Sequence, residues 1–374
     1  MKTKRDIALA AVALLGILAG PTAPTAHAAG ALLVTSTATH SVLCYDVTTK
    51  TCRQFVPPGS GGLDYPFGLT LGPDGNLYAA NYYLNNIKRY NGHTGAFMDT
   101  FPSGCGLNGP VNLVFGPDGN LYASGWLSHN LVRFNVTNGA CDVFLPAGRG
   151  GLNKAAGVIF APGDNLYVAS YGSGNVLCFD AVTGAFKNVL IPAGSGGLVG
   201  PAAMTLGPDG NFYISDYGDN KVMRYNGTNG TFISVFVPRQ LSNQPGAVDQ
   251  PTGLLFGPDG NLYVCCNNMN CINRYNGVTG AFMDVFAPAG SCGLIYPARI
   301  AFVFPPTLTC QQDTGAGTLQ LRWTGAMHRL QAQINSPAGG LTTNWFDYPG
   351  GTNSPVTVPV DSGNGSVFFR LVWP

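Results

Sequence analysis

The sequence predicts an all-β protein: a six-bladed β-propeller whose last blade is closed by N- and C-terminal strands, followed by a small C-terminal β-sandwich. A seven-residue phrase, Gly-Pro-Asp-Gly-Asn-Leu-Tyr, recurs about once every 45 residues, which is typical of one four-stranded propeller blade. Glycine and proline together number 79 of 374 residues, which indicates a turn-rich chain. After about residue 305 the phrase stops and short runs of alternating apolar and polar residues follow, which favours a small sandwich.

The phrase first runs from Gly72 to Tyr78 and returns at 116–122, 207–213 and 257–263, with a scrambled copy at 161–167. Proline at the second position of a turn, followed by Asp-Gly, sets backbone angles that reverse a chain. We therefore expect each copy to be a hairpin turn. One aspartate per separate hairpin does not make a calcium site.

A second signature ends the third strand of each blade, and it occurs six times, at Tyr45, Tyr90, Phe134, Phe179, Tyr225 and Tyr275. Six such endings and five turn phrases indicate that the sixth blade is split. Its inner strand is expected at 297–302 and its other strands within 32–56. Pairing the two ends of the chain removes the open sheet edges that a row of small sheets would expose.

Residues 1–28 have a basic start, an apolar stretch at 7–18 and a small-residue end at Ala26-His27-Ala28, which predicts a secretory signal peptide. The alternative is a membrane anchor, but the apolar run is short of the roughly twenty residues of a span. The predicted organisation is a signal peptide at 1–28, the propeller at 29–305 and the sandwich at 306–374. We expect a secreted protein, extracellular or periplasmic, with no transmembrane span.

The charge balance argues against nucleic acid as a partner. Without residues 1–28 the chain has 16 basic and 17 acidic residues, whereas nucleic-acid binders carry a basic excess on one face. Charged residues make up only 10% of the sequence. We expect a monomer that binds no nucleic acid.

Ten cysteines in an exported chain favour disulfides. Cys266 and Cys271 flank a four-residue loop between expected adjacent strands, so we predict a local bridge there, with Cys265 as the competing partner. The other pairings stay open. A zinc site at these three cysteines is the alternative, but a structural zinc site needs a fourth ligand and a different spacing.

The repeat resembles the NHL-type and streptogramin-lyase-like repeats of secreted bacterial propellers. The resemblance rests on Pro-x-Gly-Leu-x-x-Gly-Pro-Asp-Gly-Asn-Leu-Tyr followed by Arg-Tyr-Asn-Gly-x-Thr-Gly-Ala-Phe, and it covers about residues 31–304. It implies the fold but no single activity, because this superfamily includes lyases, lactonases and binding proteins. The C-terminal segment looks like the short sandwich appended to many secreted proteins of environmental bacteria.

Loops between the second and third strands of the blades should emerge on one face, called here the variable-loop face. The turn phrases should lie on the opposite turn face. Aligning the blades places four aromatic residues in one ring on the variable-loop face, together with Asn267 and Thr37. Such a ring could stack on sugars or grip a peptide, or it could pack on neighbouring blades. The four are Tyr82, Trp126, Tyr171 and Tyr217.

A ring of small residues on the inner strands is interrupted by Asn112 and Arg299. Arg299 could hold an anion through its planar fork of donors, or it could pair with Asp216 or a backbone carbonyl. We place Asn112, Asp216 and Arg299 at the channel mouth.

The leading hypothesis is a non-catalytic extracellular binding or scaffold protein that contacts a glycan or peptide through its variable-loop face. No catalytic residue, metal ligand or cofactor is assigned. The alternative is a metal-assisted lyase or lactonase acting at Asp216, Asn112 and Arg299. The resemblance implies a carboxylate cage or a histidine–glutamate pair for such enzymes, but these rings offer no second carboxylate and the chain contains no glutamate. Acid–base work by His129 with Asp216 is a further possibility.

Overall fold

The computed structural model describes residues 30–101 and 104–303 and six strands that follow them. The chain divides into two units, Gly30–Val303 and a second that includes Phe304–Pro374. The predicted signal peptide, residues 1–28, lies outside the described residues. Within the described ranges, the structure contains no helix with the length and hydropathy of a membrane span.

Six four-stranded antiparallel sheets form the blades of a propeller, which confirms the predicted all-β six-bladed propeller. In each blade the chain runs from an inner strand at the central channel to an outer strand, and the inner strands of neighbouring blades contact one another around the channel. The strands of blade 1 are β4 (Pro66–Leu71), β5 (Leu77–Asn81), β6 (Asn86–Tyr90) and β7 (Phe97–Phe101); those of blade 2 are β8 (Pro110–Phe115), β9 (Leu121–Gly125), β10 (Asn130–Phe134) and β11 (Cys141–Leu145). Those of blade 3 are β12 (Ala155–Ala161), β13 (Asn165–Ser170), β14 (Asn175–Asp180) and β15 (Phe186–Ile191); those of blade 4 are β16 (Pro201–Leu206), β17 (Phe212–Asp216), β18 (Lys221–Tyr225) and β19 (Phe232–Val237); those of blade 5 are β20 (Pro251–Phe256), β21 (Leu262–Cys266), β22 (Cys271–Tyr275) and β23 (Phe282–Ala287).

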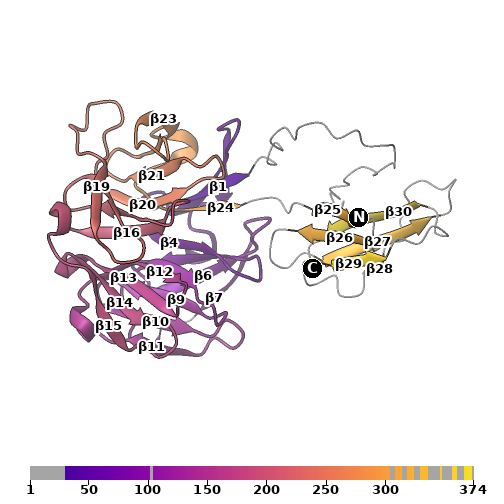
Figure 1. The fold of residues 1–374 in the computed structure, drawn as a ribbon, viewed down its shortest axis with the longest axis horizontal. Helices are drawn as coiled ribbons and strands as arrows, with labels where there is room; N and C mark the ends of the chain where they lie inside the picture. The colour runs from indigo at the N-terminus through magenta and orange to yellow at the C-terminus, as the bar shows by residue number, and fades with distance from the viewer. Residues whose placement is uncertain are drawn as a thin grey trace. The chain divides into compact units, whose positions relative to one another are not determined.

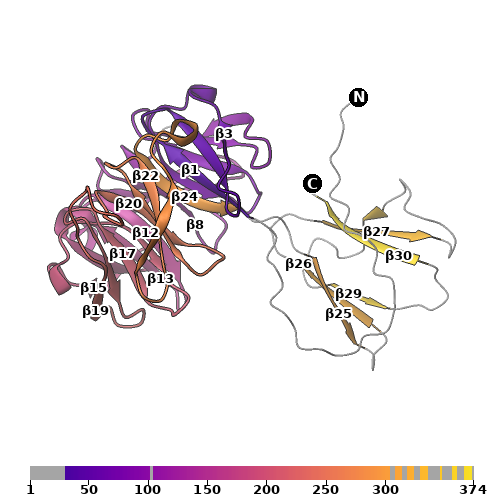
Figure 2. The same ribbon diagram turned by 90° about the horizontal axis from the view of Figure 1, so that it is seen from above.

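Blade 6 combines strands from distant parts of the sequence. Its order is β24 (Pro297–Val303), β1 (Ala31–Ser36), β2 (Ser41–Asp46) and β3 (Cys52–Val56). β24 pairs antiparallel with β1, with Leu33 opposite Ala301. Figures 1 and 2 both show orange β24 beside indigo β1.

The turn phrase closes on itself through side-chain hydrogen bonds. In the first copy, Asp74 Oδ1 accepts from the Asn76 backbone N–H (3.1 Å), while Oδ2 accepts from Asn76 Nδ2 (2.7 Å) and from the Tyr78 hydroxyl (2.8 Å). In the scrambled copy, Asp164 has a positive φ of 52° and Asn165 Nδ2 donates to the carbonyl of Pro162 instead. The first pattern recurs at Asp118, Asp209 and Asp259.

The tyrosine that ends the phrase joins neighbouring blades. The buried Tyr78 ring packs against Phe101 of its own outer strand (centroids 5.7 Å apart) and edge-on against Phe115 of the next inner strand (5.2 Å). Tyr213 lies between Phe236 and Phe256 in the same way. Edge-to-face aromatic pairs contribute about 0.5–1.5 kcal/mol beyond the apolar area that they bury, so this repeated contact stabilises the ring.

A second repeated contact, the connector clasp, fastens the connector before each blade to the first residue of that blade's outer strand. In blade 1 the phenyl ring of Phe97 covers Gly61, so closely that a Cβ added to Gly61 would lie 2.1 Å from the ring. Gly61 also has a φ of 61°, which glycine adopts without steric cost. The same clasp joins Gly150 to Phe186, Gly196 to Phe232 and Gly246 to Phe282.

Disulfides occupy the two remaining clasp positions. Cys105 is bonded to Cys141 in blade 2, and Cys292 is bonded to Cys52 in blade 6. Each bridge pairs a connector cysteine at positive φ, 52° for Cys105 and 51° for Cys292, with a cysteine at the position that phenylalanine holds elsewhere.

The predicted local bridge between Cys266 and Cys271 is not formed in the structure. Both are buried free thiols, although they lie directly opposite each other on β21 and β22. Cys265 is also free and fully buried. Closeness along the chain suggested the local bridge, whereas the two bridges that are formed depend on the repeated contact between connector and outer strand.

The C-terminal strands form two three-stranded sheets. One has the order β25 (Leu308–Asp313), β26 (Thr318–Trp323) and β29 (Val356–Pro359), and the other has the order β28 (Phe346–Asp347), β27 (Arg329–Asn335) and β30 (Ser366–Val372). All pairings within them are antiparallel. The residues between these strands lie outside the described ranges, so the packing of the sheets as a sandwich stays a prediction.

Candidate functional site

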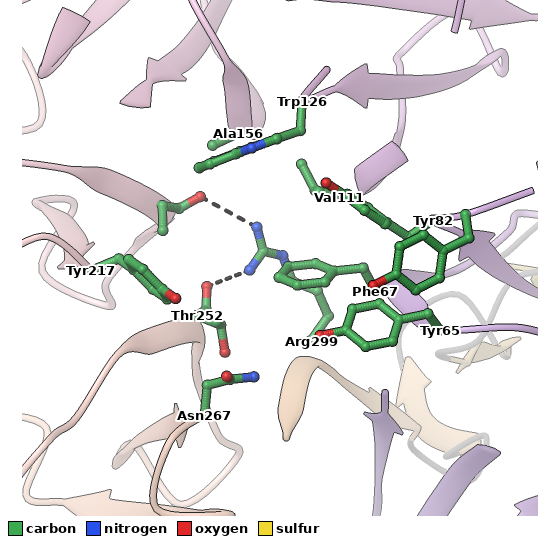
Figure 3. A pocket seen from close by; sticks show the side chains of 12 residues that line it. Tyr65, Phe67, Tyr82, Val111, Trp126, Ala156, Tyr217, Thr252, Asn267 and Arg299 are labelled. Carbon is green, nitrogen blue, oxygen red and sulfur yellow. Dashed lines mark hydrogen bonds between the residues drawn. The ribbon is translucent and has the colours of Figure 1, made fainter. Parts of the chain in front are cut away.

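A pocket of about 250 Å³ opens at the centre of the variable-loop face. Aromatic side chains from blades 1, 2 and 4 form much of its wall (Figure 3). We call it the aromatic pocket, and its lining residues are Tyr65, Phe67, Tyr82, Tyr83, Val111, Trp126, Ala156, Ala202, Tyr217, Thr252, Asn267 and Arg299.

Most of the predicted aromatic ring lies at this pocket. Tyr82, Trp126, Tyr217 and Asn267 line it, each directly after the second strand of its blade. Tyr171 does not line the pocket; its ring packs behind Trp126, with centroids 4.6 Å apart, and 6.1 Å from Tyr217. The sixth member of the ring, Thr37, is fully buried and donates to the carbonyl of Tyr296 (3.0 Å).

The aromatic residues form two clusters. In blade 1, Tyr65 contacts both Tyr82 (5.9 Å) and Tyr83 (4.9 Å), and Phe67 contacts Tyr82 (6.3 Å). The other cluster comprises Trp126, Tyr171 and Tyr217, and the Lys154 ammonium lies 5.3 Å from the Trp126 ring. The rings therefore pack on one another, and most of them also wall a cavity.

Arg299 lies at the floor of the aromatic pocket and is only 7% exposed. Its Nη1 donates to the carbonyls of Thr252 and Ala298, Nη2 donates to the carbonyl of Ala202 (3.3 Å), and Nε donates to Asn112 Oδ1 (3.3 Å). Figure 3 shows the guanidinium at the centre of the pocket. Burial lowers the pKa of Arg299 to about 10, which leaves it charged at neutral pH.

Asn112 accepts a hydrogen bond from Arg299, but it does not line the aromatic pocket. It lines a second cavity of about 360 Å³ that follows the inner strands further toward the turn face. Arg299 borders both cavities and thus separates them. Small inner-strand residues allow the close approach of strands here: a Cβ on Gly253 would lie 2.6 Å from the carbonyl oxygen of Ala298.

Asp216 does not join Asn112 and Arg299 at the channel mouth. Its side chain is fully buried, and its carboxylate accepts from the backbone N–H groups of Val199 (3.1 Å) and Gly200 (2.7 Å). Lys221 lies 3.6 Å away. At the same position in blade 1, Asn81 Oδ1 accepts from the Asp64 N–H (2.8 Å). The position therefore fastens the connector before the blade, because the buried N–H groups of the connector need acceptors.

The histidines of the variable-loop face also have structural roles. His129 has a φ of 55°, and its Nδ1 accepts from the backbone N–H of Lys154 in the next blade (2.9 Å). His40 holds the Tyr65 N–H in the same way (3.0 Å). The same task falls to asparagine at Asn85, Asn220 and Asn270. We call this contact the loop staple, and it leaves Nδ1 of His129 engaged by an amide rather than by Asp216.

Sequence reasoning missed Tyr65, Phe67 and Tyr83 as pocket residues. The inner-strand ring was sought two residues after the proline that begins most inner strands, at Gly68 and its equivalents. Arg299 apart, the residues directly after that proline line the pocket, namely Phe67, Val111, Ala202 and Thr252. Because side chains alternate along a strand, a shift of one residue exchanges the two rings. The Tyr65-Pro66-Phe67 sequence was the available signal.

The donors of this site do not converge as metal ligands. In the described ranges, no group of three or more histidine, cysteine or acidic side chains is arranged to hold a metal ion. What the pocket does offer is aromatic surface, the Asn267 amide, tyrosine hydroxyls and one guanidinium.

Comparison with solved structures finds the same fold. A chain from the crystal structure of a nidogen–laminin complex is similar with a TM-score of 0.61 and 16% identity, over 74% of this chain and 98% of that chain. The structure of streptogramin B lyase is similar with a TM-score of 0.47 and 17% sequence identity, over 68% of this chain and 78% of that chain. The structure of virginiamycin B lyase from Staphylococcus aureus is similar with a TM-score of 0.46 and 17% sequence identity, over 68% of this chain and 80% of that chain. No family model and no curated protein matches this chain. At these identities the likeness concerns the fold alone.

Proposed function

We propose that this protein is an extracellular binding propeller that holds a ligand in the aromatic pocket of its variable-loop face. The observation that supports this most directly is the pocket itself, where six aromatic side chains surround a cavity of about 250 Å³. Aromatic residues and arginine are enriched at the centres of protein-binding surfaces. The volume suits one or two side chains of a ligand rather than a whole small domain.

Between a peptide and a glycan, the lining favours a peptide. Among the described residues that line the pocket, only Asn267 has a side-chain amide, and its Nδ2 already donates to the carbonyl of Pro297 (3.2 Å). Thr252 and Arg299 are the remaining polar residues of this lining besides the tyrosines. A sugar with many hydroxyl groups would leave most of them without partners in such a pocket, and unpaired buried polar groups are costly. An apolar or aromatic side chain of a peptide would not.

The alternative, a metal-assisted lyase or lactonase, depended on Asp216 as its carboxylate, and Asp216 does not line the pocket. Asp216 is engaged by the connector N–H groups and by Lys221, away from the aromatic pocket.

We also propose that the chain is secreted and that its two C-terminal sheets pack as a small sandwich. Two disulfides support export, because such bonds persist in oxidising compartments. Alternating patterning of the C-terminal strands supports the sandwich.

The proposed function can be tested by panning a phage-displayed random peptide library on the full-length protein. Peptides enriched by the wild type should lose affinity at least about tenfold for Trp126→Ala and Tyr217→Ala, since truncating an aromatic anchor typically costs about 2 kcal/mol. Val278→Ala is the control, because Val278 is 82% exposed on the turn face. Enriched peptides that bind all four proteins equally would contradict the proposal. If no peptide is enriched and the protein binds on a glycan array, the ligand is a glycan and not a peptide.

A further inference from the structure

We propose that the peptide held in the aromatic pocket presents a carboxylate to Arg299, either its C-terminal carboxylate or an aspartate or glutamate side chain. This inference rests on the proposed function, because it names the group that the same pocket recognises. Four observations carry it: the missing counter-ion, the unused donor, a second cation beside the pocket and the aromatic walls.

Arg299 lacks a counter-ion. Among the described residues, no carboxylate lies within 4.0 Å of its guanidinium, and all four of its hydrogen-bond acceptors are neutral oxygens. The other arginines of the propeller are either paired with aspartate or exposed. Those paired are Arg89, Arg133, Arg224, Arg239 and Arg274, and those exposed without a pair are Arg53 and Arg149. A buried charge without an opposite charge is unfavourable. The carboxylate of a ligand would supply the counter-ion that Arg299 lacks.

The guanidinium also has spare donor capacity. It carries five N–H groups, and four hydrogen bonds are formed, which leaves one N–H of Nη2 without a partner among the described residues. The Nε and Nη2 edge makes only the two 3.3 Å bonds to Asn112 and Ala202.

The same edge binds carboxylates elsewhere in this molecule. Arg133 uses Nε (3.0 Å) and Nη2 (3.1 Å) to hold both oxygens of Asp142, and Arg274 holds Asp284 in the same way (3.2 and 2.6 Å). Charge-assisted bidentate pairs are stronger than bonds to neutral oxygens. We infer that a ligand carboxylate in the aromatic pocket accepts a charge-assisted hydrogen bond from the Nη2 N–H that has no partner among the described residues.

One further cation lies beside the aromatic pocket, and its positive charge favours an anion. Lys154 lies over Trp126 and Tyr171, and no carboxylate of the described residues lies within 4.0 Å of its ammonium. Asp249, close to Tyr217, is engaged by Asn220 (3.1 Å) and Ser242 (3.0 Å).

The aromatic walls strengthen this attraction. The Phe67 ring lies 5.6 Å from Cζ of Arg299, and tyrosines and Trp126 form much of the pocket wall around it. Electrostatic attraction is stronger where water is excluded. The apolar wall would contact the residue that carries or adjoins the carboxylate.

A purely structural role for Arg299 is the competing explanation, because its bonds join strands β8, β16, β20 and β24. That role requires a guanidinium but gives no preference between an acid and its amide. The two explanations therefore differ in a measurement on the wild-type protein, with no substitution at Arg299.

The experiment measures binding of matched acid and amide probes to the full-length wild type by isothermal titration calorimetry, at up to about 10 mM ligand. One pair is N-acetyl-Phe-Gly with a free C-terminus and its C-terminal amide, and the other is N-acetyl-Asp-Phe-amide and N-acetyl-Asn-Phe-amide. We expect at least one acid to bind about tenfold more tightly than its amide, and the pair that shows the difference identifies the source of the carboxylate. Methyl glucuronide and methyl glucoside form a third pair.

The Arg299→Gln variant should bind the acid and the amide with equal affinity. The Arg299→Lys variant should retain part of the preference for the acid. Arg149→Gln, at an exposed arginine outside the pocket, should leave it unchanged. Equal binding of acid and amide overturns the inference and leaves the peptide pocket standing. If no peptide probe binds, both the carboxylate inference and the peptide-binding proposal are overturned. If only methyl glucuronide binds more tightly than its neutral counterpart, the ligand is an acidic glycan and not a peptide.

Discussion

The two faces of the propeller are held together in different ways. On the turn face, the side-chain hydrogen bonds of the phrase stay within one blade: Asp259 accepts from Asn261, Tyr263 and Arg274 of the same blade. On the variable-loop face, the loop staple, exemplified by His129 and Lys154, joins one blade to the next. The connector clasp likewise fastens each connector to the blade that follows it.

This difference explains where a binding site can form. The aspartate, asparagine and tyrosine of the turn phrase are partners of one another, so the phrase offers few free groups to a ligand. The variable-loop face needs only one staple and one clasp per blade to keep its shape. Its remaining positions, such as Trp126 and Arg299, are free to differ between blades and to face the pocket.

The largest effect is expected from the disulfide clasp that joins the two ends of the ring. Cys52 and Cys292 are 240 residues apart, and a bridge that closes so long a loop stabilises by about 4–5 kcal/mol in the chain-entropy model. The variant with both cysteines changed to serine should therefore lose about 4 kcal/mol in guanidinium unfolding and also bind ligand less well. A loss below about 1 kcal/mol would mean that the variable-loop face does not depend on this clasp.

The second bridge offers an internal control for that comparison. In the Cys105→Gly/Cys141→Phe double variant, the disulfide is replaced by the glycine–phenylalanine clasp of blades 1, 3, 4 and 5. This variant should be more stable than Cys105→Ser/Cys141→Ser, because the introduced phenyl ring can cover a glycine at positive φ. Unfolding in guanidinium measures both variants, and equal stability would show that the two kinds of clasp are not equivalent.

A turn-face glycine should affect stability strongly and binding little. A Cβ on Gly277 would lie 1.7 Å from the carbonyl oxygen of Gly260 in the same blade, so Gly277→Ala should cost about 3 kcal/mol through overpacking. Gly260→Ala is the matched control, with a φ of 73° and nothing within 4 Å of the added Cβ, and should cost about 1–2 kcal/mol. Urea unfolding measures both. If the folded Gly277→Ala variant binds ligand more weakly than the wild type, the two faces do not act independently.

The loop staple predicts a smaller effect and a specific rescue. His129→Leu removes the acceptor of the Lys154 N–H and should cost about 1–2 kcal/mol. His129→Asn should stay within about 0.5 kcal/mol of the wild type, because Asn85, Asn220 and Asn270 make the same bond in other blades. Thermal unfolding of the two variants tests this, and similar losses for both would refute the staple as the function of His129.

The smallest effect concerns acid stability of the turn face. Partial burial opposes the ionisation of Asp209, but the hydrogen bonds from Asn211 and the charge of Arg224 outweigh it and lower its pKa. A carboxyl group with a lowered folded-state pKa binds fewer protons than in the unfolded chain, so its contribution is present above the usual value of about 3.9 and is lost as the pH falls through the lowered pKa. Asp209→Asn should therefore cost about 1 kcal/mol at about pH 7 and less at about pH 3, as measured by urea unfolding at both values. A cost that is the same at both pH values would contradict this.

Much of the site could have been found with the repeat as a guide. The ring of Tyr82, Trp126 and Tyr217 came directly from aligning the blades. The same alignment places Cys105 and Cys292 at the glycine position of the clasp, and Cys141 and Cys52 at its phenylalanine position. Both bridges were therefore encoded as paired substitutions in the repeat, and the prediction of a Cys266–Cys271 bridge overlooked this signal in favour of closeness along the chain.

The sequence by itself determined the elements that depend on neighbouring residues. Hairpin turns follow from turn chemistry, because their interactions act over short distances along the chain. The blade count and the split blade follow from counting a repeat with a period of about 45 residues. Only the tertiary structure decided what each exceptional residue does. Asp216 and Arg299 both break the repeat, yet the carboxylate is satisfied by the connector before it, while the guanidinium meets strands of several blades at the channel without a counter-ion among the described residues. Whether a buried charge is paired depends on residues that are distant in sequence, and the ring brings them together.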